Sequence, residues 1–264
     1  MIGFIGTGNM GGALAIAAAK TGAKLLLCNR TMAKAEALAQ QLGCATATAQ
    51  EIAATCDYIF LGVKPQMMGE LLSSLAPTLK DRKTPFTLVS MAAGLTMDSL
   101  RQVAGGSYPV IRMMPNTPVS VGSGVILYDA TEDISPAALD GFCAAMQYAG
   151  YLDRLPEGLM DAGSAVSGCG PAFVSMFLEA LADGGVACGL PRQKSLILAA
   201  HTLQGTARLL LESGKHPGQL KDEVCSPGGS TIEGVKALEG GSLRSTVISA
   251  VQAAHHRTKE LGKA

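Results

Sequence analysis

The chain has 264 residues, of which 48% are hydrophobic and 16% are charged. This length suits a two-domain enzyme or one large α/β domain, and the composition argues against a disordered chain. The 21 Lys and Arg residues balance the 21 Asp and Glu residues, so no surplus positive charge is available to attract a nucleic acid. We therefore expect no nucleic-acid partner.

The seven cysteines are scattered, odd in number and without a C-x-x-C spacing, which indicates neither a disulfide framework nor a zinc site. We expect no metal and a reducing, cytoplasmic location. The first 20 residues have no basic residue before Lys20, and five glycines interrupt their apolar stretch, which is unlike a signal peptide. The longest apolar windows, such as 196–211, contain polar residues, so we expect no membrane span.

From residue 1 to 155, short apolar runs of strand length alternate with segments of helical period, as in successive βαβ units. The expected strands are 2–5, 24–28, 58–63, 86–91, 108–112, 125–128 and 151–154. The expected helices are 10–20, 32–41, 49–55, 68–79, 97–104 and 136–149. Thr31, Thr48, Thr96 and Ser135 precede four of these helices as N-cap candidates.

After Pro156 the strand-like runs end and long helical periods continue to the C-terminus. We expect a second, all-α domain over 156–264. Its helices are predicted at 159–186, 192–212, 218–224, 231–238 and 243–261, and Pro171 should kink or divide the first. The apolar helices at 173–181 and 196–211 carry few charges, so their faces are expected either at a dimer interface or packed within the chain.

The segment Gly6-Thr7-Gly8-Asn9-Met10-Gly11 follows an apolar strand directly and enters an alanine-rich helix. This is the setting that the dinucleotide-binding fingerprint requires. Its glycines serve the tight turn, the approach of the pyrophosphate and the packing of helix on strand, while free N–H groups hold the phosphates. The alternative is a glycine-rich turn without a ligand. We expect an N-terminal α/β dinucleotide-binding (Rossmann-like) domain over 1–155.

The second strand should end near the adenosine ribose, where sites that prefer NAD usually present a carboxylate. The chain has Asn29-Arg30-Thr31 there instead. Arg30 and Thr31 can donate hydrogen bonds to a 2′-phosphate, which favours NADPH over NADH. The alternative is that Arg30 is an ordinary solvated charge and that both cofactors are used.

Three further segments follow strands on the carboxyl edge of the predicted sheet, where open α/β sheets bind ligands. Gly62-Val63-Lys64-Pro65 and Ala92-Ala93-Gly94 could line the nicotinamide side. Lys64 is a candidate catalytic acid. The alternative is that Lys-Pro after a strand only forms a turn. Asn116 could bind cofactor or substrate, or cap a turn.

In the helical domain, Ser226-Pro227-Gly228-Gly229-Ser230-Thr231 leads into a predicted helix. Its N–H groups and hydroxyls form a potential socket for a carboxylate. The alternative is an ordinary connection between two helices. The four histidines show no Ser-His-Asp arrangement.

Several segments together resemble the pyrroline-5-carboxylate reductase family over the whole chain. They are Phe4–Met10, Val63–Pro65, Ala92–Gly94, Met114–Pro118, Ser167–Ala172, Ala182–Val186 and, above all, His216–Val224 with Ser226–Thr231. The resemblance implies hydride transfer from NAD(P)H to the C=N carbon of 1-pyrroline-5-carboxylate, which gives L-proline.

The resemblance also implies site residues. Gly229, Ser230 and Thr231 match the family's substrate-carboxylate loop, to which Ser226 belongs, and the Thr231 hydroxyl matches the group at the ring nitrogen. Glu157 matches a residue near substrate and cofactor. Ser230 departs from the family, where Ala or Thr is commoner, but the backbone N–H is unchanged. The family forms dimers, often arranged into decamers.

Two alternative functions remain for the chain. A 3-hydroxy-acid dehydrogenase would share the glycine turn and a helical second domain, but such enzymes use a lysine early in that domain, and 159–190 contains none. A non-catalytic NADPH sensor would have no use for the loop that ends in Thr231.

Overall fold

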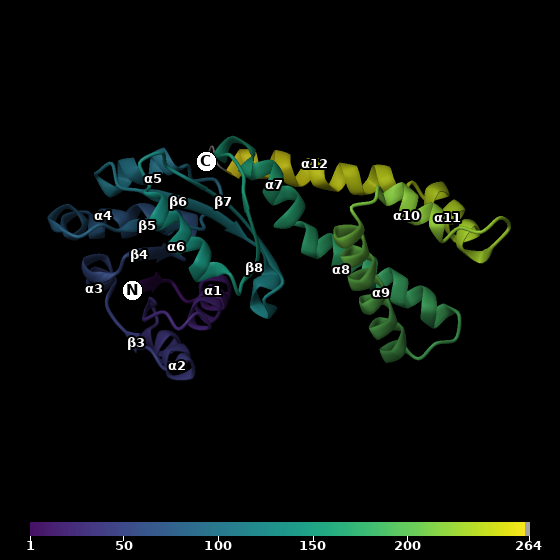
Figure 1. Ribbon diagram of the computed structural model, residues 1–264, viewed down its shortest axis with the longest axis horizontal. Coiled ribbons are helices and arrows are strands. Elements are labelled where there is room, and N and C mark those ends of the chain that lie inside the picture. The colour runs from purple at the N-terminus through teal and green to yellow at the C-terminus, as the bar shows by residue number, and fades with distance from the viewer. Residues whose placement is uncertain (262–264) are drawn as a thin grey trace. The chain divides into compact units, whose positions relative to one another are not determined.

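The structure is a computed structural model that describes residues 1–261, and Figure 1 shows its helices and strands. The chain divides into two compact units. Among the described residues, the first comprises 1–169 together with 254–261, and the second comprises 170–253.

An eight-stranded sheet forms the centre of the first unit, in the order β3-β2-β1-β4-β5-β6-β7-β8. All neighbouring strands are parallel except β6 and β7. The strands are β1 (Ile2–Ile5), β2 (Leu25–Cys28), β3 (Ala45–Thr46), β4 (Tyr58–Leu61), β5 (Thr87–Ser90), β6 (Val110–Pro115), β7 (Gly124–Ala130) and β8 (Gly150–Arg154). The seven predicted strands are confirmed to within a few residues, and the two-residue β3 was not predicted.

Helices cover both faces of this sheet (Figure 1). The core on one face includes side chains of α1 (Asn9–Ala19), α2 (Met32–Leu42) and α6 (Pro136–Met146). The core on the other face includes α3 (Ala49–Thr55), α4 (Pro65–Asp81) and α5 (Met97–Ala104). Burial on both faces explains why β1 and β4 are apolar at consecutive positions. The predicted Rossmann-like fold is confirmed, because the first six strands have the order of dinucleotide-binding sheets.

Three of the four expected N-caps form. Thr48, Thr96 and Ser135 each accept a hydrogen bond from the backbone N–H three residues later, at the starts of α3, α5 and α6. Thr31 occupies the N-cap position of α2, but its side chain accepts no such bond. The ψ angle of Thr31 is 95°, whereas that of Thr48 is 160°. The backbone N–H groups that follow Thr31 are therefore oriented differently relative to its side chain.

The predicted helix over 159–186 is divided into a 3₁₀ turn η2 (Glu157–Leu159), α7 (Met160–Ser167) and α8 (Gly170–Ala187). The break lies at Gly168 and Cys169, just before Pro171, which sits in the first turn of α8 where its missing N–H costs no hydrogen bond. The other C-terminal helices are α9 (Arg192–Ser213), α10 (Pro217–Glu223), α11 (Ser230–Gly240) and α12 (Leu243–Leu261).

The first unit continues beyond residue 155, where the sequence suggested a domain boundary. Both η2 and α7 belong with the sheet, because Glu157 and Asp161 form ion pairs with Arg112 of β6. The first continuous segment of this compact unit therefore runs to Cys169. The division into a dinucleotide-binding domain over 1–155 and a helical dimerisation and substrate domain over 156–264 stays a prediction.

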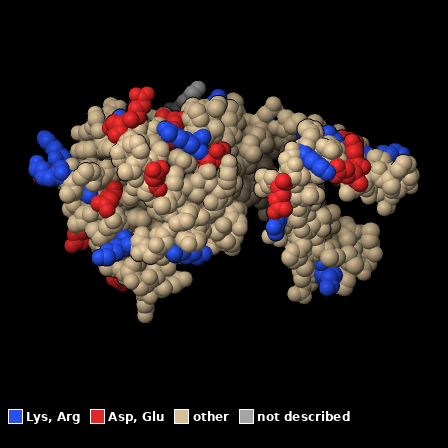
Figure 2. Space-filling view, in the orientation of Figure 1, with Lys and Arg blue, Asp and Glu red and all other residues tan. Residues whose placement is uncertain are grey.

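Helices α8 and α9 leave many large apolar side chains exposed. They are Val174, Met176, Phe177, Leu181, Leu196, Ile197, Leu198, Leu209 and Leu211. Figure 2 shows broad uncharged areas over these two helices, and basic and acidic groups are interspersed over the visible side of the first unit. One segment, Glu157–Ala187, is long and apolar enough to cross a membrane. A single segment of this kind is weak evidence for a membrane span, because helices of other proteins pass the same test.

Candidate active site

Three glycines bring backbone segments of the first unit into direct contact at the carboxyl edge of the sheet. A Cβ atom on Gly6 would lie 2.5 Å from the carbonyl oxygen of Gly62, and one on Gly62 would lie 2.4 Å from that of Gly6. A Cβ on Gly11 would lie 2.1 Å from the carbonyl oxygen of Gly6. Gly6 also has a φ of +101°, which disfavours other residues. We call Gly6, Gly11 and Gly62 the glycine junction.

The glycine junction places the start of α1 at the end of β1. Gly8 is the N-cap, no side chain caps the helix, and its first turn has no acidic residue. A Cβ on Gly8 would meet no atom within 4 Å, so the backbone is open to a ligand on this side. The N–H groups and the helix dipole make this end of α1 suited to bind a phosphate.

A cavity of about 330 Å³ lies at this end of α1. Thr7, Gly8 and Asn9 line it together with Lys34 of α2 and Ser120 of the 3₁₀ turn η1 (Thr117–Val121). The Thr7 side chain is buried, and its hydroxyl has no hydrogen-bond partner among the described residues. A buried hydroxyl without a partner is costly, so the site offers a free polar group to a cofactor.

Asn29 connects the glycine turn to the segment that follows β2. Its Oδ1 accepts a hydrogen bond from the Thr7 N–H at 3.3 Å, and its Nδ2 donates to the Thr31 carbonyl at 3.2 Å. Arg30 and Thr31 are exposed beside it. Burial raises the pKa of the neighbouring Cys28 thiol, so this thiol is neutral at physiological pH. The structure therefore brings the predicted cofactor residues 6–11 and 29–31 together.

The other predicted cofactor segments follow β4 and β5. Strand β4 pairs in parallel with β1, and β5 pairs in parallel with β4, so all three strands end at the same edge of the sheet. Lys64 is the N-cap of α4 and Pro65 its first residue, an arrangement that sets a turn. Gly62 and Val63 precede them. Ala92 donates its N–H to Ser90 Oγ at 3.3 Å, and Ala93 comes next. The chemical role of Lys64 stays a prediction.

Asn116 is buried and makes structural hydrogen bonds with both ends of its amide. Its Nδ2 donates to the Ser167 carbonyl at 2.9 Å, and its Oδ1 accepts from the Val125 N–H at 2.8 Å. The side chain thus joins the end of β6 to β7 and α7. These bonds favour the structural alternative for Asn116 over direct contact with the cofactor.

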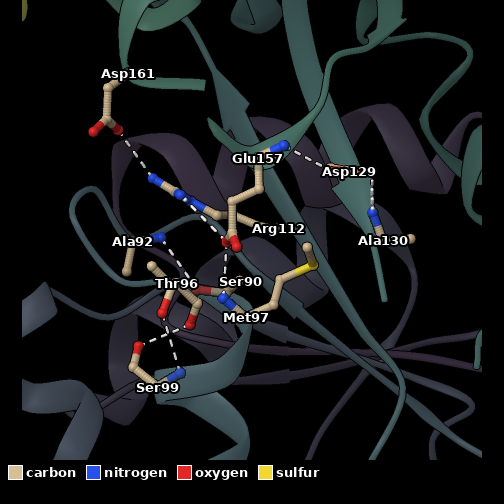
Figure 3. Close-up of polar contacts among 10 residues, drawn as sticks. All are labelled: Ser90, Ala92, Thr96, Met97, Ser99, Arg112, Asp129, Ala130, Glu157 and Asp161. Carbon is tan, nitrogen blue, oxygen red and sulfur yellow. Dashed lines mark hydrogen bonds and ion pairs between the residues drawn. The ribbon is translucent and has the colours of Figure 1, made fainter. Parts of the chain in front are cut away.

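Glu157 points into a cluster of polar groups rather than into open space (Figure 3). Its Oε1 accepts from the N–H of Met97, the first residue of α5, at 2.8 Å, and from Arg112 Nη1 at 3.3 Å. Its own N–H donates to Asp129 Oδ2 at 2.8 Å. Arg112 Nη2 also contacts Asp161 Oδ1 at 3.1 Å. Glu157 therefore holds the start of α5, which follows the segment Ala92–Gly94.

Arg112 and Asp161 belong to this cluster and were not predicted. The Arg112 side chain is only 4% exposed, and a buried charge requires a partner. Arg112 interrupts the apolar run of β6, and this interruption is the sequence signal that could have identified it. Within residues 1–261, no group of three or more His, Cys, Asp or Glu side chains is placed to hold a metal ion.

In the second unit, Ser226, Gly229, Ser230 and Thr231 form a turn at the start of α11. The Gly229 N–H donates to the Ser226 carbonyl at 3.0 Å, and Gly228 between them has a φ of +69°. Gly229 is the N-cap, and no side chain caps the helix. Ser230 and Thr231 are its first two residues and are exposed. This helix end can bind a carboxylate through its N–H groups, with two hydroxyls beside it.

Known proteins match most or nearly all of the chain. A family model described as "Pyrroline-5-carboxylate reductase dimerisation" matches residues 157–261, and one described as "NADP oxidoreductase coenzyme F420-dependent" matches residues 1–94. A pyrroline-5-carboxylate reductase of Synechocystis is 44% identical over 81% of this chain and 78% of its own length. That of Escherichia coli is 37% identical over 99% and 98%. The crystal structure of Plasmodium falciparum pyrroline carboxylate reductase with NADP bound has a TM-score of 0.85 and 32% identity, and the match covers 99% of this chain and 97% of that one.

The glycine junction predicts that alanine substitutions at two adjacent glycines of α1 change thermal stability in opposite directions. Gly11→Ala should lower the thermal midpoint, because its Cβ would lie 2.1 Å from the Gly6 carbonyl oxygen and such overpacking costs about 1–3 kcal/mol. Gly12→Ala is the matched control, since its Cβ would have no neighbour closer than 3.6 Å and alanine favours a helix by about 0.5–1 kcal/mol. Thermal unfolding without cofactor measures both. Equal midpoints would contradict the proposed packing.

The Glu157 cluster predicts a graded loss of stability. Glu157→Gln keeps an acceptor for the Met97 N–H but removes the charge that faces Arg112, whereas Glu157→Ala removes both. We expect the free energy of unfolding in urea to fall in that order, with the alanine variant losing about 1–3 kcal/mol. Glu132→Gln, at an exposed position of the same unit, is the control. If both Glu157 variants keep wild-type stability and lose only substrate affinity, Glu157 contacts substrate instead.

Proposed function

The chain belongs to the pyrroline-5-carboxylate reductase family, and from that premise we propose that it reduces 1-pyrroline-5-carboxylate to L-proline with NAD(P)H, the last step of proline biosynthesis. The observation that carries this function is a relationship at 37% identity over 99% of the chain. It covers both the dinucleotide-binding half and the loop that ends in Thr231. The chain is thus an oxidoreductase that acts on a C=N bond.

The first unit fits a dinucleotide cofactor, because the start of α1 is uncapped, Gly8 is open and the Thr7 hydroxyl lacks a partner. When bound, NAD(P)H supplies the hydride that forms the new C–H bond at the imine carbon. We assign the phosphates to residues 6–11, the adenosine ribose to residues 29–31 and the nicotinamide side to residues 62–65 with Ala92 and Ala93. The absence of a carboxylate after β2 favours NADPH.

The second unit supplies the groups suited to the substrate. We assign the substrate carboxylate to the N–H groups of Gly229, Ser230 and Thr231 at the start of α11. A cyclic imine that binds in its protonated form is already an electrophile, so the protein mainly has to hold its carbon in place. Positioning of this kind can lower a barrier by about 7–11 kcal/mol. The Thr231 hydroxyl orients the ring nitrogen or relays its proton.

The family's dimerisation model covers α8 and α9, so the chain associates with further copies of itself. We assign the exposed apolar side chains of these two helices to the interface of a homodimer, which would bury them. The same burial accounts for much of the apolar stretch Glu157–Ala187. Assembly of such dimers into decamers is a further proposal that rests on the family resemblance.

We also propose a cytoplasmic location. All seven cysteines lie within residues 1–261, and the structure pairs none of them. Free thiols are the normal state of cysteine in a reducing compartment.

The enzyme assay that tests this function follows the loss of NADPH absorbance with 1-pyrroline-5-carboxylate and identifies L-proline as the product. A 3-hydroxy acid with NADP⁺ serves as the rival substrate. Turnover of the hydroxy acid alone would assign the chain to a dehydrogenase, and cofactor binding without turnover of either would leave a sensor.

Thr231→Ala should lower kcat/KM at least about tenfold, which corresponds to the loss of one hydrogen bond to a charged group. Thr231→Ser retains a hydroxyl and is expected to keep most of the activity. Because Thr231 is exposed in the first turn of α11, both variants should unfold at the wild-type temperature. Wild-type kinetics in the alanine variant would refute the role of the hydroxyl.

A further inference from the structure

The segment that connects β5 to α5 is held at both of its ends. At its start, the Ala92 N–H donates to Ser90 Oγ at 3.3 Å. At its end, the Met97 N–H donates to Glu157 Oε1 at 2.8 Å. Between these anchors, the backbone groups of residues 93–95 form no hydrogen bond with any residue that the structure describes. The position of this segment therefore depends on the two anchors.

Both anchors lead to one pair of neighbouring residues in the sheet, Ser90 of β5 and Arg112 of β6. Ser90 accepts the first bond itself, and Arg112 forms an ion pair with the acceptor of the second. Alternate side chains of a strand point to the same face, and Leu88 and Val110, two residues earlier, belong to the core that includes α5. Ser90 and Arg112 therefore lie on the face that α5 covers, beside the start of this helix (Figure 3).

The Arg112 guanidinium holds the Glu157 carboxylate in place. Its Nη1 lies 3.3 Å from Glu157 Oε1, the same oxygen that accepts the Met97 N–H. The carboxylate thus lies between two positive groups, the guanidinium and the amino end of α5. Because the Glu157 side chain is 25% exposed, a carboxylate released by Arg112 could turn towards water and leave the Met97 N–H.

The stability of the fold gives little reason for an arginine at this position. The Arg112 side chain is 4% exposed, and its neighbours Ile111 and Met113 in β6 are fully buried. A buried ion pair is often no more stabilising than apolar side chains of similar volume. The Arg112 Nε also lacks a hydrogen-bond partner among residues 1–261, which adds to the cost of burial. What this arginine positions therefore explains it better than what it stabilises.

We propose that Arg112 is a positioning residue for hydride transfer. By holding Glu157 at the start of α5, it fixes the backbone of residues 92–95 beside the nicotinamide ring. The proposal rests on the proposed function in assigning this segment to the nicotinamide side. Reacting atoms must lie about 3–3.5 Å apart, and a misplacement of about 1 Å can slow a reaction about 100-fold. Loss of the anchor should therefore slow the hydride step more than it weakens cofactor binding.

The kinetic test uses the full-length enzyme and NADPH that carries deuterium at the transferred position. Arg112→Met should lower kcat at least about tenfold, and the isotope effect on kcat should reach its full value, because the hydride step then limits turnover. The affinity for adenosine 2′,5′-bisphosphate, which lacks the nicotinamide, should stay at the wild-type value. Arg112→Lys keeps a positive charge beside Glu157 and should recover much of the rate.

The matched control is Asp161→Asn. Asp161 is the second carboxylate on Arg112, with Oδ1 at 3.1 Å from Nη2, and its exposed fraction of 29% is close to the 25% of Glu157. Its hydrogen bond in the described residues is with Arg112 and not with α5. Asp161→Asn should therefore lower the thermal midpoint and keep a kcat near the wild-type value.

Glu157→Ala removes the anchor but leaves Arg112 in place, so it should slow turnover as Arg112→Met does. This variant also keeps the proposal testable if Arg112→Met fails to fold. A wild-type kcat in Glu157→Ala and in every folded Arg112 variant, or a loss of kcat in Asp161→Asn as large as theirs, would overturn the proposal.

Hydrogen exchange separates the proposal from the proposed function, because it requires no 1-pyrroline-5-carboxylate. The peptide that spans residues 91–97 is followed with NADP⁺ bound. We expect protection in the wild type and in Asp161→Asn, and exchange at least about tenfold faster in Glu157→Ala and Arg112→Met, in which the segment has lost an anchor. Wild-type protection in the last two variants would overturn the proposal. The expected difference, in an enzyme that fails to reduce pyrroline-5-carboxylate, would refute the function alone.

Discussion

The contact between the backbones of Gly6, Gly11 and Gly62 is the constraint on which the rest of the site depends. Two of these glycines directly follow β1 and β4, and the third lies in the first turn of α1, so the contact fixes a helix start at the edge of two neighbouring strands. A side chain at any of the three positions would separate these segments. The uncapped N–H groups of α1 are thereby held where a phosphate can reach them, and the cavity that includes Lys34 lies beside them.

On the other half of the sheet, a buried arginine fixes the positions of neighbouring elements, as the glycine contact does for α1. Arg112 of β6 requires anionic partners because it is withdrawn from water, and it takes them from Glu157 and Asp161, which follow the last strand. The same Glu157 carboxylate binds the first N–H of α5. One ion cluster thus joins β6, η2, α7 and the start of α5, which explains why the first unit extends to Cys169.

Hydrophobic pattern and turn chemistry were sufficient to predict seven strands and the dinucleotide-binding fold, because buried parallel strands produce unmistakable apolar runs. The strand β3 is too short to have a period. The roles of Asn116 and Glu157 depend on partners far along the chain, such as Ser167 and Met97, and sequence spacing does not reveal these.

The most direct measurement is a crystal structure of the enzyme with NADP⁺ and L-proline. We expect the pyrophosphate within hydrogen-bond distance of the first N–H groups of α1, next to Gly8, and the proline carboxylate at the N–H groups that begin α11, with its ring nitrogen at the Thr231 hydroxyl. A pyrophosphate bound away from the start of α1, or a proline carboxylate held by groups other than those of α11, would contradict the assignment of the two helix ends.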